Sequence, residues 1–153
     1  MPAQRGVIRN IKRASQINNF KDLLRPSLIS KNKTITPTDI DGLIDYGGRA
    51  FVYIEGKMRT KQTEQGQRMA LENVISSHAK AGHPAMAVIF EHDTTADQQV
   101  YVAHCFVRGI YCEIQIRSLC GSSYGGNWWW PQRKNIKVIE AIECFEKEFR
   151  IYQ

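Results

Sequence analysis

The sequence lacks any long hydrophobic run. No apolar stretch approaches the roughly 20 residues that a membrane-spanning helix needs. The basic residues at the N-terminus are not followed by an apolar core, so we expect no signal peptide. These absences predict a cytoplasmic protein with no membrane partner.

Closely spaced cysteines are also missing. None of the four cysteines stands in a C-x-x-C motif, which argues against a zinc ribbon and against a thioredoxin-like redox site. Buried free thiols are the expected state. The four residues are Cys105, Cys112, Cys120 and Cys144.

Acidic residues are fewer than basic ones. The 153 residues include 21 Lys and Arg against 15 Asp and Glu, which gives a net charge of +6 and a pI near 9.3. A positive protein attracts polyanions, and the release of counterions from phosphates drives nucleic-acid binding. The length predicts one domain, and the composition of 42% hydrophobic and 24% charged residues is that of a soluble globular protein.

The segment 37–57 predicts a β-hairpin. Residues 39–46 alternate charged and apolar side chains, and residues 50–58 are rich in the Phe, Val, Tyr and Ile that strands favour. Between the two runs, Gly47 and Gly48 supply the positive φ angles that a tight turn needs.

The length of the turn decides which side chains share a face. With a three-residue loop at 47–49, Asp41 faces Glu55 and Asp39 faces Lys57, and all four project from one face of the hairpin. A two-residue Gly-Gly turn would instead place the aspartates on the face opposite Glu55.

Two acids side by side need a compensating charge. Asp41 and Glu55 would repel each other, and charges at the end of an apolar strand are costly to desolvate unless they are paired or bound to a cation. Carboxylate oxygens suit Mg²⁺, which is commonly held by one or two carboxylates and a substrate phosphate. Lys57 could orient an attacking water or neutralise charge that builds up on phosphorus. These groups suffice for phosphodiester hydrolysis.

The arrangement of Asp41, a turn and then Glu55-Gly56-Lys57 resembles the PD-(D/E)xK nuclease superfamily. Within it, the chain is most similar to the small Holliday-junction resolvases and VRR-NUC-type nucleases, which are often found in phages. The resemblance implies a restriction-endonuclease-like α/β core and cleavage of branched or duplex DNA with Mg²⁺ or Mn²⁺. It implies that Asp41 and Glu55 are metal ligands and that Lys57 is the catalytic lysine. Junction resolution would require two active sites and hence a symmetric homodimer, located in the host cytoplasm if the chain is phage-encoded.

The sequence departs from the superfamily pattern in two places. The expected Pro-Asp pair is here Pro37-Thr38-Asp39, so Asp39 competes with Asp41 as metal ligand, and Asp41 is preferred for its position opposite Glu55. Many relatives place a Glu on the N-terminal helix, whereas no Glu precedes Pro37 here. An ordinary surface hairpin with a cross-strand ion pair is the alternative interpretation.

A helix is predicted from about residue 63 to residue 79. Its apolar face includes Leu71 and Ile75, and Gln67 lies four residues before Leu71 on the same inward face. A buried amide needs a partner, and the acids of the hairpin or the attacking water are the nearest candidates. A Gln at this place is also found in the resolvase-like families, so Gln67 is the fourth predicted catalytic residue. Gln65 is the second choice, and a solvated Gln67 is the alternative.

The remaining elements complete an α/β fold. Residues 84–92 form a near-continuous apolar run, which predicts a buried strand parallel to its neighbour across the helical connection. The whole order predicts a mixed sheet flanked by helices. The other expected elements are a helix at 15–24, strands at 99–111 and 111–116, and a helix from 131 or 135 to 149.

Basic and aromatic residues outside the hairpin are candidate contacts to DNA. At least one of the three tryptophans at 128–130 is hard to bury, and an exposed indole can stack on a base. Anchoring of the last helix by these tryptophans is the alternative, as is a solvated strand end for the basic residues after Lys57. A basic nucleic-acid-binding module without catalysis would use the same contacts. The candidates are Lys12, Arg13, Arg59, Lys61, Trp129, Arg133 and Lys134.

Overall fold

The computed structural model divides the chain into two units, residues 1–39 and 40–153. In its described part, the first unit is a two-stranded antiparallel hairpin of β1 (Ile29–Ser30) and β2 (Lys33–Thr34). The predicted helix at 15–24 lies outside the described residues. The structure describes residues 29–30, 33–34, 40–63, 65–95, 98–114, 116, 119, 126–131 and 136–151.

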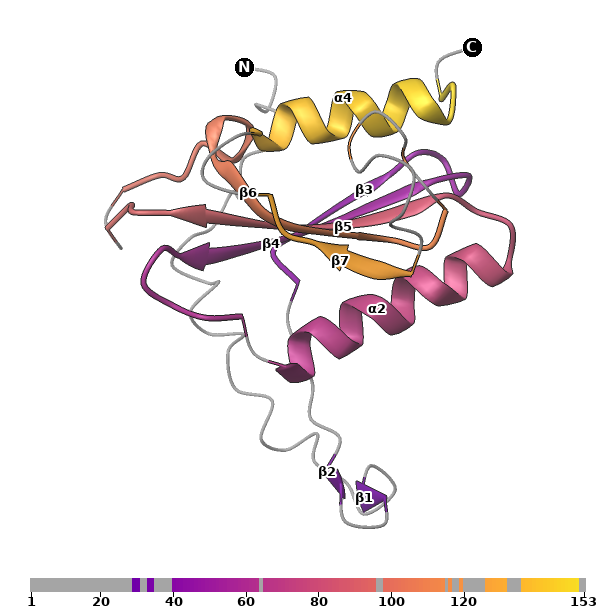
Figure 1. The fold of residues 1–153 in the computed structure, drawn as a ribbon, viewed down its shortest axis with the longest axis horizontal. Coiled ribbons are helices and arrows are strands. Elements are labelled where there is room, and N and C mark those ends of the chain that lie inside the picture. Colours follow the sequence, from indigo (N-terminus) through magenta and orange to yellow (C-terminus); the bar gives the residue numbers. More distant parts are fainter. Residues whose placement is uncertain are drawn as a thin grey trace, which may run out of the picture. The chain divides into compact units, whose positions relative to one another are not determined.

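The second unit contains a mixed five-stranded sheet between two helices (Figure 1). Helix α2 (Gln65–Lys80) covers one face, and helix α4 (Val138–Glu148) covers the other. The strand order is β3-β4-β5-β6-β7, and the α/β class is therefore confirmed. The strands are β3 (Gly42–Asp45), β4 (Phe51–Met58), β5 (Ala85–His92), β6 (Phe106–Cys112) and β7 (Asn127–Trp129).

The hairpin of β3 and β4 has the register that the three-residue loop predicts. Gly42 pairs with Ile54 and Asp45 pairs with Phe51. Gly47 and Gly48 have backbone φ angles of 66° and 75°, which residues other than glycine rarely adopt. The hairpin therefore places Asp41 across from Glu55 at the open end of the two strands.

Strands β4 and β5 are parallel, as predicted, and α2 is the connection between them. Strand β5 is buried on both faces along Ala85 to Phe90. Its alternate residues serve two separate cores. Ala87 and Ile89 pack with Leu71 and Ile75 of α2, whereas the intervening residues pack with the core on the α4 side.

The predicted strand at 99–111 is wrong in its first half. Residues 102–104 form a short 3₁₀ helix, and the strand begins only at Phe106. The alternation of Val100 and Val102 with polar residues reflects packing against the core beside α4, not pairing with β5. A separate strand at 111–116 is also wrong, because residues 113 and 114 bend away after Cys112.

Strand β7 was not expected, and it separates the three tryptophans. Trp129 is half-buried and packs against the core on the α4 side. Trp128 and Trp130 stack on each other, with ring centroids 5.3 Å apart, and Trp128 packs with the core on the α2 side. Trp130 is 42% exposed, so one indole does remain in contact with solvent.

Helix α4 begins at Val138, close to the second of the two predicted starts. Its buried stripe is Val138, Ala141 and Phe145, and at its start the Glu140 carboxylate accepts a hydrogen bond of 2.7 Å from the backbone N–H of Lys137. The described helices include none that is both long enough and apolar enough to cross a bilayer.

A carboxylate network fastens α2 to the end of β6. The Glu113 carboxylate accepts hydrogen bonds from the hydroxyls of Ser76 and Tyr111, the latter at 2.6 Å. These two bonds hold the pKa of Glu113 below its ordinary value. Burial, followed by the bond to Glu113, raises the pKa of Tyr111 to about 12. The ionised form of Glu113 is therefore the form that the folded protein favours.

Replacing Glu113 by Ala should lower the free energy of unfolding by about 1–3 kcal/mol at pH 7, because two donors lose a charged acceptor. A lowered carboxyl pKa contributes stability above the ordinary Glu pKa, and that contribution is lost as the pH falls through the lowered value. Urea unfolding of both proteins at several pH values measures the difference. The exposed Glu143→Ala is the control. A Glu113→Ala difference that stays constant down to pH 3 would contradict this role.

Candidate active site

Glu55 is a buried carboxylate in the second half of strand β4, with 3% of its surface exposed. Its side chain points to the α2 face of the sheet. The Oε1 atom accepts a hydrogen bond from the Gln67 amide and lies 3.1 Å from the Lys57 ammonium nitrogen. The Oε2 atom is buried and has no hydrogen-bond partner among the described residues. One oxygen of this carboxylate is thus satisfied, and the other is buried without a partner in the part of the chain that the structure describes.

The surroundings of Glu55 disfavour its charge. Burial raises the pKa of Glu55, and the negative charge of Asp41 raises it further. The Lys57 ammonium and the Gln67 amide lower the pKa, but they offset only part of this rise. A cation bound to the free oxygen would favour the ionised form, so the site is electrostatically prepared for a positive ligand.

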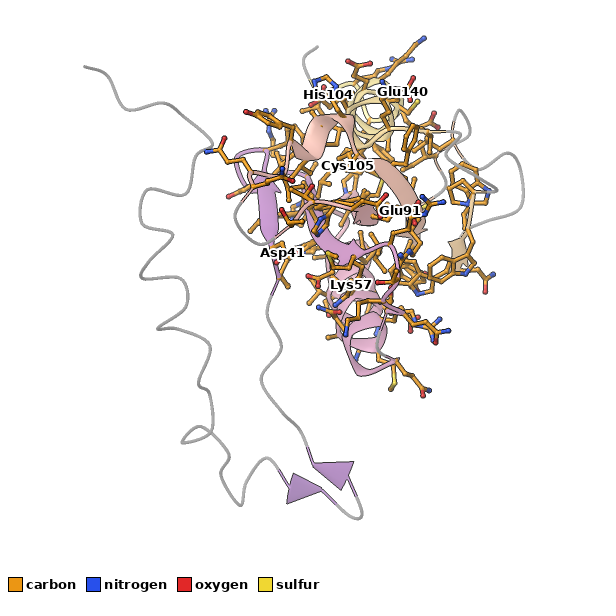
Figure 2. All side chains as sticks on the ribbon, turned by 90° about the vertical axis from the view of Figure 1, so that its left-hand side faces the viewer. Asp41, Lys57, Glu91, His104, Cys105 and Glu140 are labelled. Atoms are coloured by element: carbon orange, nitrogen blue, oxygen red, sulfur yellow. The ribbon has the colours of Figure 1, made fainter. Side chains whose placement is uncertain are left out.

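Asp41 lies beside Glu55, across the hairpin. Its Oδ2 atom accepts a hydrogen bond of 2.7 Å from the backbone N–H of Gly56, and its side chain is exposed. This bond fixes the carboxylate at the end of the two strands. Figure 2 shows Asp41 and Lys57 lower in the view than His104 and Glu140, which lie at the top of the second unit beside α4. Asp39 lies outside the described residues.

Gly56, between Glu55 and Lys57, has no room for a side chain. A Cβ atom there would lie 2.5 Å from the ring of Phe90 on the neighbouring strand. Phe90 is 4% exposed and belongs to the core on the α4 side. The two functional side chains therefore point to one face of β4 while the residue between them is pressed against a ring on the other.

Gln67 occupies the place that its helical spacing predicts. It is 7% exposed, and its amide nitrogen donates to Glu55. Its Oε1 atom is buried without a hydrogen-bond partner in the described part of the chain. Gln65, the second choice, is exposed at the start of α2.

The oxygens gathered here fit a hard divalent cation. Buried Glu55 Oε2 and Gln67 Oε1 have no hydrogen-bond partner within the described ranges, and the Asp41 carboxylate adds a second negative charge. Mg²⁺ is commonly held by one or two carboxylates and retains several waters. Among the described residues, no group of three or more His, Cys, Asp or Glu side chains could hold a metal ion, so the candidate donor set is two carboxylates and one amide.

Lys57 can act on both the carboxylate and a substrate. Its side chain is 19% exposed, while the ammonium remains next to buried Glu55. An amine in this position neutralises Glu55 in the absence of a cation. In the presence of a phosphate ester it can stabilise negative charge on the non-bridging oxygens.

The predicted nucleic-acid contacts that the structure describes fall into two groups. Arg59 and Lys61 follow β4 and line a pocket of about 530 Å³, whereas Trp129 packs against the core instead. Lys12, Arg13, Arg133 and Lys134 lie outside the described residues.

Other residues that line the same pocket were not among the predicted contacts; they include Thr63, Arg68, Arg108 and Trp130. Arg68 follows Gln67 directly, and Trp130 is two residues beyond Trp128 on the α2 side of β7. Helical and strand spacing could have pointed to both. We call the pocket lined by Arg59, Lys61, Thr63, Arg68, Arg108 and Trp130 the basic pocket.

The geometry therefore brings together Asp41, Glu55, Lys57 and Gln67 as the sequence predicts. Three of the four come from a single β-strand and the first turns of the helix that follows it. The fourth is placed by the hairpin. No family model matches the chain, and no curated protein or solved structure matches it either.

Proposed function

We propose that this chain is a Mg²⁺-dependent DNA endonuclease that hydrolyses phosphodiester bonds, built on a restriction-endonuclease-like core. The observation that carries the proposal is the buried Glu55 carboxylate. One of its oxygens is held by Lys57 and Gln67, and the other has no partner among the described residues. A structural ion pair would not need to leave a charged oxygen buried and unsatisfied.

Asp41 and Glu55 would hold the cation, with the Gln67 amide oxygen as a further donor. Mn²⁺ could take the place of Mg²⁺, since both prefer carboxylate and carbonyl oxygens. When bound, the cation supplies Lewis-acid activation and charge neutralisation at the phosphate. The hydrogen bond from Gly56 to Asp41 and the bond from Gln67 to Glu55 orient the two carboxylates before the substrate arrives.

Lys57 would contribute electrostatic stabilisation. Attack on a phosphodiester increases the negative charge on the non-bridging oxygens, and a fixed ammonium beside them lowers the energy of that state more than it lowers the energy of the substrate. The partial exposure of Lys57 leaves it accessible from the solvent side.

A cleavage panel tests the proposal. Purified protein is incubated with linear duplex, single-stranded, flapped and four-way DNA, with Mg²⁺, with Mn²⁺ or with a chelator. We expect cleavage of at least one of these DNAs that depends on the divalent ion and stops with the chelator. Preference for the four-way substrate would support a junction resolvase. Tight DNA binding with no cleavage under any condition would contradict the proposal and leave a non-catalytic binding module.

A further inference from the structure

The basic pocket lies beside the candidate active site. Arg59 and Lys61 follow Lys57 closely in the chain, and Arg68 follows Gln67. Glu91, which also lines the pocket, pairs directly with Lys57 between β4 and β5. The volume of about 530 Å³ is in the range of pockets that hold small ligands.

Arg108 builds one wall of the pocket. Its guanidinium donates to the backbone carbonyls of Met58, Arg59 and Lys61, and it forms an ion pair of 3.4 Å with Glu91. These contacts hold the loop after β4 against β6. They also neutralise Glu91, which is the one acid among the described residues that line the pocket, so this lining remains positive.

Donors without acceptors line another part of the pocket. The Arg68 Nε and the Thr63 hydroxyl are buried, and neither has a hydrogen-bond partner among the described residues. The Arg68 guanidinium lies over the Trp130 ring, 5.9 Å from its centroid, which limits its freedom. Buried donors without acceptors are costly, and an anion rich in acceptor oxygens would satisfy them.

Trp130 is fixed on the opposite side. Its ring lies so close to Gly109 of β6 that a Cβ atom at that glycine would be 2.5 Å away, and Trp128 stacks on it. The indole is thus a rigid support for Arg68, while 42% of Trp130 remains exposed. Arg59 pairs with Asp93 and Arg108 pairs with Glu91, so Lys61 and Arg68 are the pocket cations without an ion pair among the described residues. These two cations, the unsatisfied Arg68 Nε and Thr63 hydroxyl, and the aromatic ring together match a nucleotide phosphate better than a neutral ligand.

We infer that the basic pocket binds a phosphate of the nucleic-acid strand, next to the phosphodiester that is cleaved. This inference rests on the proposed function for the identity of the strand. Lys61 and Arg68 supply the charges that contact the phosphate, Thr63 adds a hydroxyl donor, and Trp130 holds Arg68 in place. The phosphate is either an internal diester or the 5′ phosphate at the end of the strand, and both present the same non-bridging oxygens.

Binding without cleavage tests the pocket separately from the nuclease. Fluorescence anisotropy of a labelled single-stranded oligonucleotide is measured in chelator, so that no divalent ion takes part. Lys61→Gln and Arg68→Gln should each weaken binding about tenfold, and each should reduce the slope of log K against log salt by about one. The exposed Lys147→Gln on α4 removes the same charge far from the pocket and should change affinity less than twofold.

Inorganic phosphate should compete with the oligonucleotide on the unsubstituted protein and lose this effect in the Lys61→Gln/Arg68→Gln double variant. A comparison of oligonucleotides with a 5′ phosphate and with a 5′ hydroxyl shows whether the pocket binds a terminal phosphate or an internal diester. A preference for the phosphorylated end that the double variant loses assigns the pocket to a strand terminus, and equal binding of the two assigns it to an internal diester. Thermal denaturation shows that each variant is folded, and Lys61 is exposed, so its replacement leaves the core intact.

If the double variant has the same affinity and salt slope as Lys147→Gln, the basic pocket does not bind the phosphate. That result would leave the proposed nuclease activity untouched. If the unsubstituted protein cleaves no DNA while the pocket variants lose affinity as expected, the nuclease proposal is refuted and phosphate binding by the basic pocket is retained.

Discussion

Glu55→Gln should reduce metal-dependent DNA cleavage at least about 100-fold, because a carboxylate that holds the cation becomes a neutral amide. The substitution conserves volume, and the new amide oxygen can still accept the hydrogen bond from Gln67. DNA affinity in chelator should stay within about twofold of the unsubstituted protein, because Glu55 is buried and offers almost no surface for contact with DNA. Glu143→Gln on the exposed side of α4 is the matched control and should cleave normally. Full cleavage by Glu55→Gln would remove Glu55 from the mechanism.

The same variant should be more stable than the unsubstituted protein when no divalent ion is present. The folded protein raises the pKa of Glu55, chiefly through burial and then through Asp41. A raised carboxyl pKa means that the charge destabilises the fold above that pKa, and that this penalty is absent below the ordinary Glu value. Urea unfolding in chelator should therefore show the gain at pH 7 and a much smaller one near pH 4. Addition of Mg²⁺ should stabilise the unsubstituted protein and not the variant.

Lys57→Met should lower the free energy of unfolding and should also abolish cleavage. Removing the ammonium leaves Glu55 as a buried charge without its ion pair, which costs about 3–5 kcal/mol for a fully buried pair. Lys57 is 19% exposed, so a loss of about 2 kcal/mol is expected here. Because Glu55 can take up a proton, the loss should shrink as the pH falls towards 4. Equilibrium unfolding measures it, with Lys147→Met as the control.

The double variant Glu55→Gln/Lys57→Met separates the two roles of the lysine. With Glu55 already neutral, replacement of Lys57 should cost less than about 1 kcal/mol, while cleavage stays absent. The resulting cycle gives the coupling between the two side chains directly. If Lys57→Met destabilises the Glu55→Gln protein as much as the unsubstituted one, the lysine does not act by neutralising the carboxylate.

The local part of the site was predictable from the sequence. The two glycines predict a tight turn of two or three residues, and the structure has the three-residue alternative, which fixes which residues oppose each other in β3 and β4. Helical periodicity then places Gln67 on the inward face of α2. Each of these steps depends on residues close together in the chain, where backbone geometry is restrictive.

The basic pocket was not predictable in the same way. Arg108 contacts the carbonyl of Lys61, 47 positions earlier, and only the pairing of β5 with β6 brings them together. Trp130 is placed by β7, a three-residue strand that has no hydrophobic alternation to distinguish it from a loop. Alternation can also predict a strand that does not form. Val100 and Val102 alternate with polar residues, but they pack against the core on the α4 side, and residues 102–104 form a 3₁₀ helix outside the sheet.

The contact between Gly56 and Phe90 changes how the tripeptide Glu55-Gly56-Lys57 should be understood. In a library that randomises residues 55–57, the middle codon should converge on glycine even when selection acts only on expression level, since a larger residue must displace a buried ring. The outer two codons should then diversify together, because loss of Lys57 alone leaves Glu55 without its ion pair. Sequence constraint inside the tripeptide would thus report two unrelated pressures, one from the charged pair on the α2 face of β4 and one from the packing of Phe90 on the α4 face.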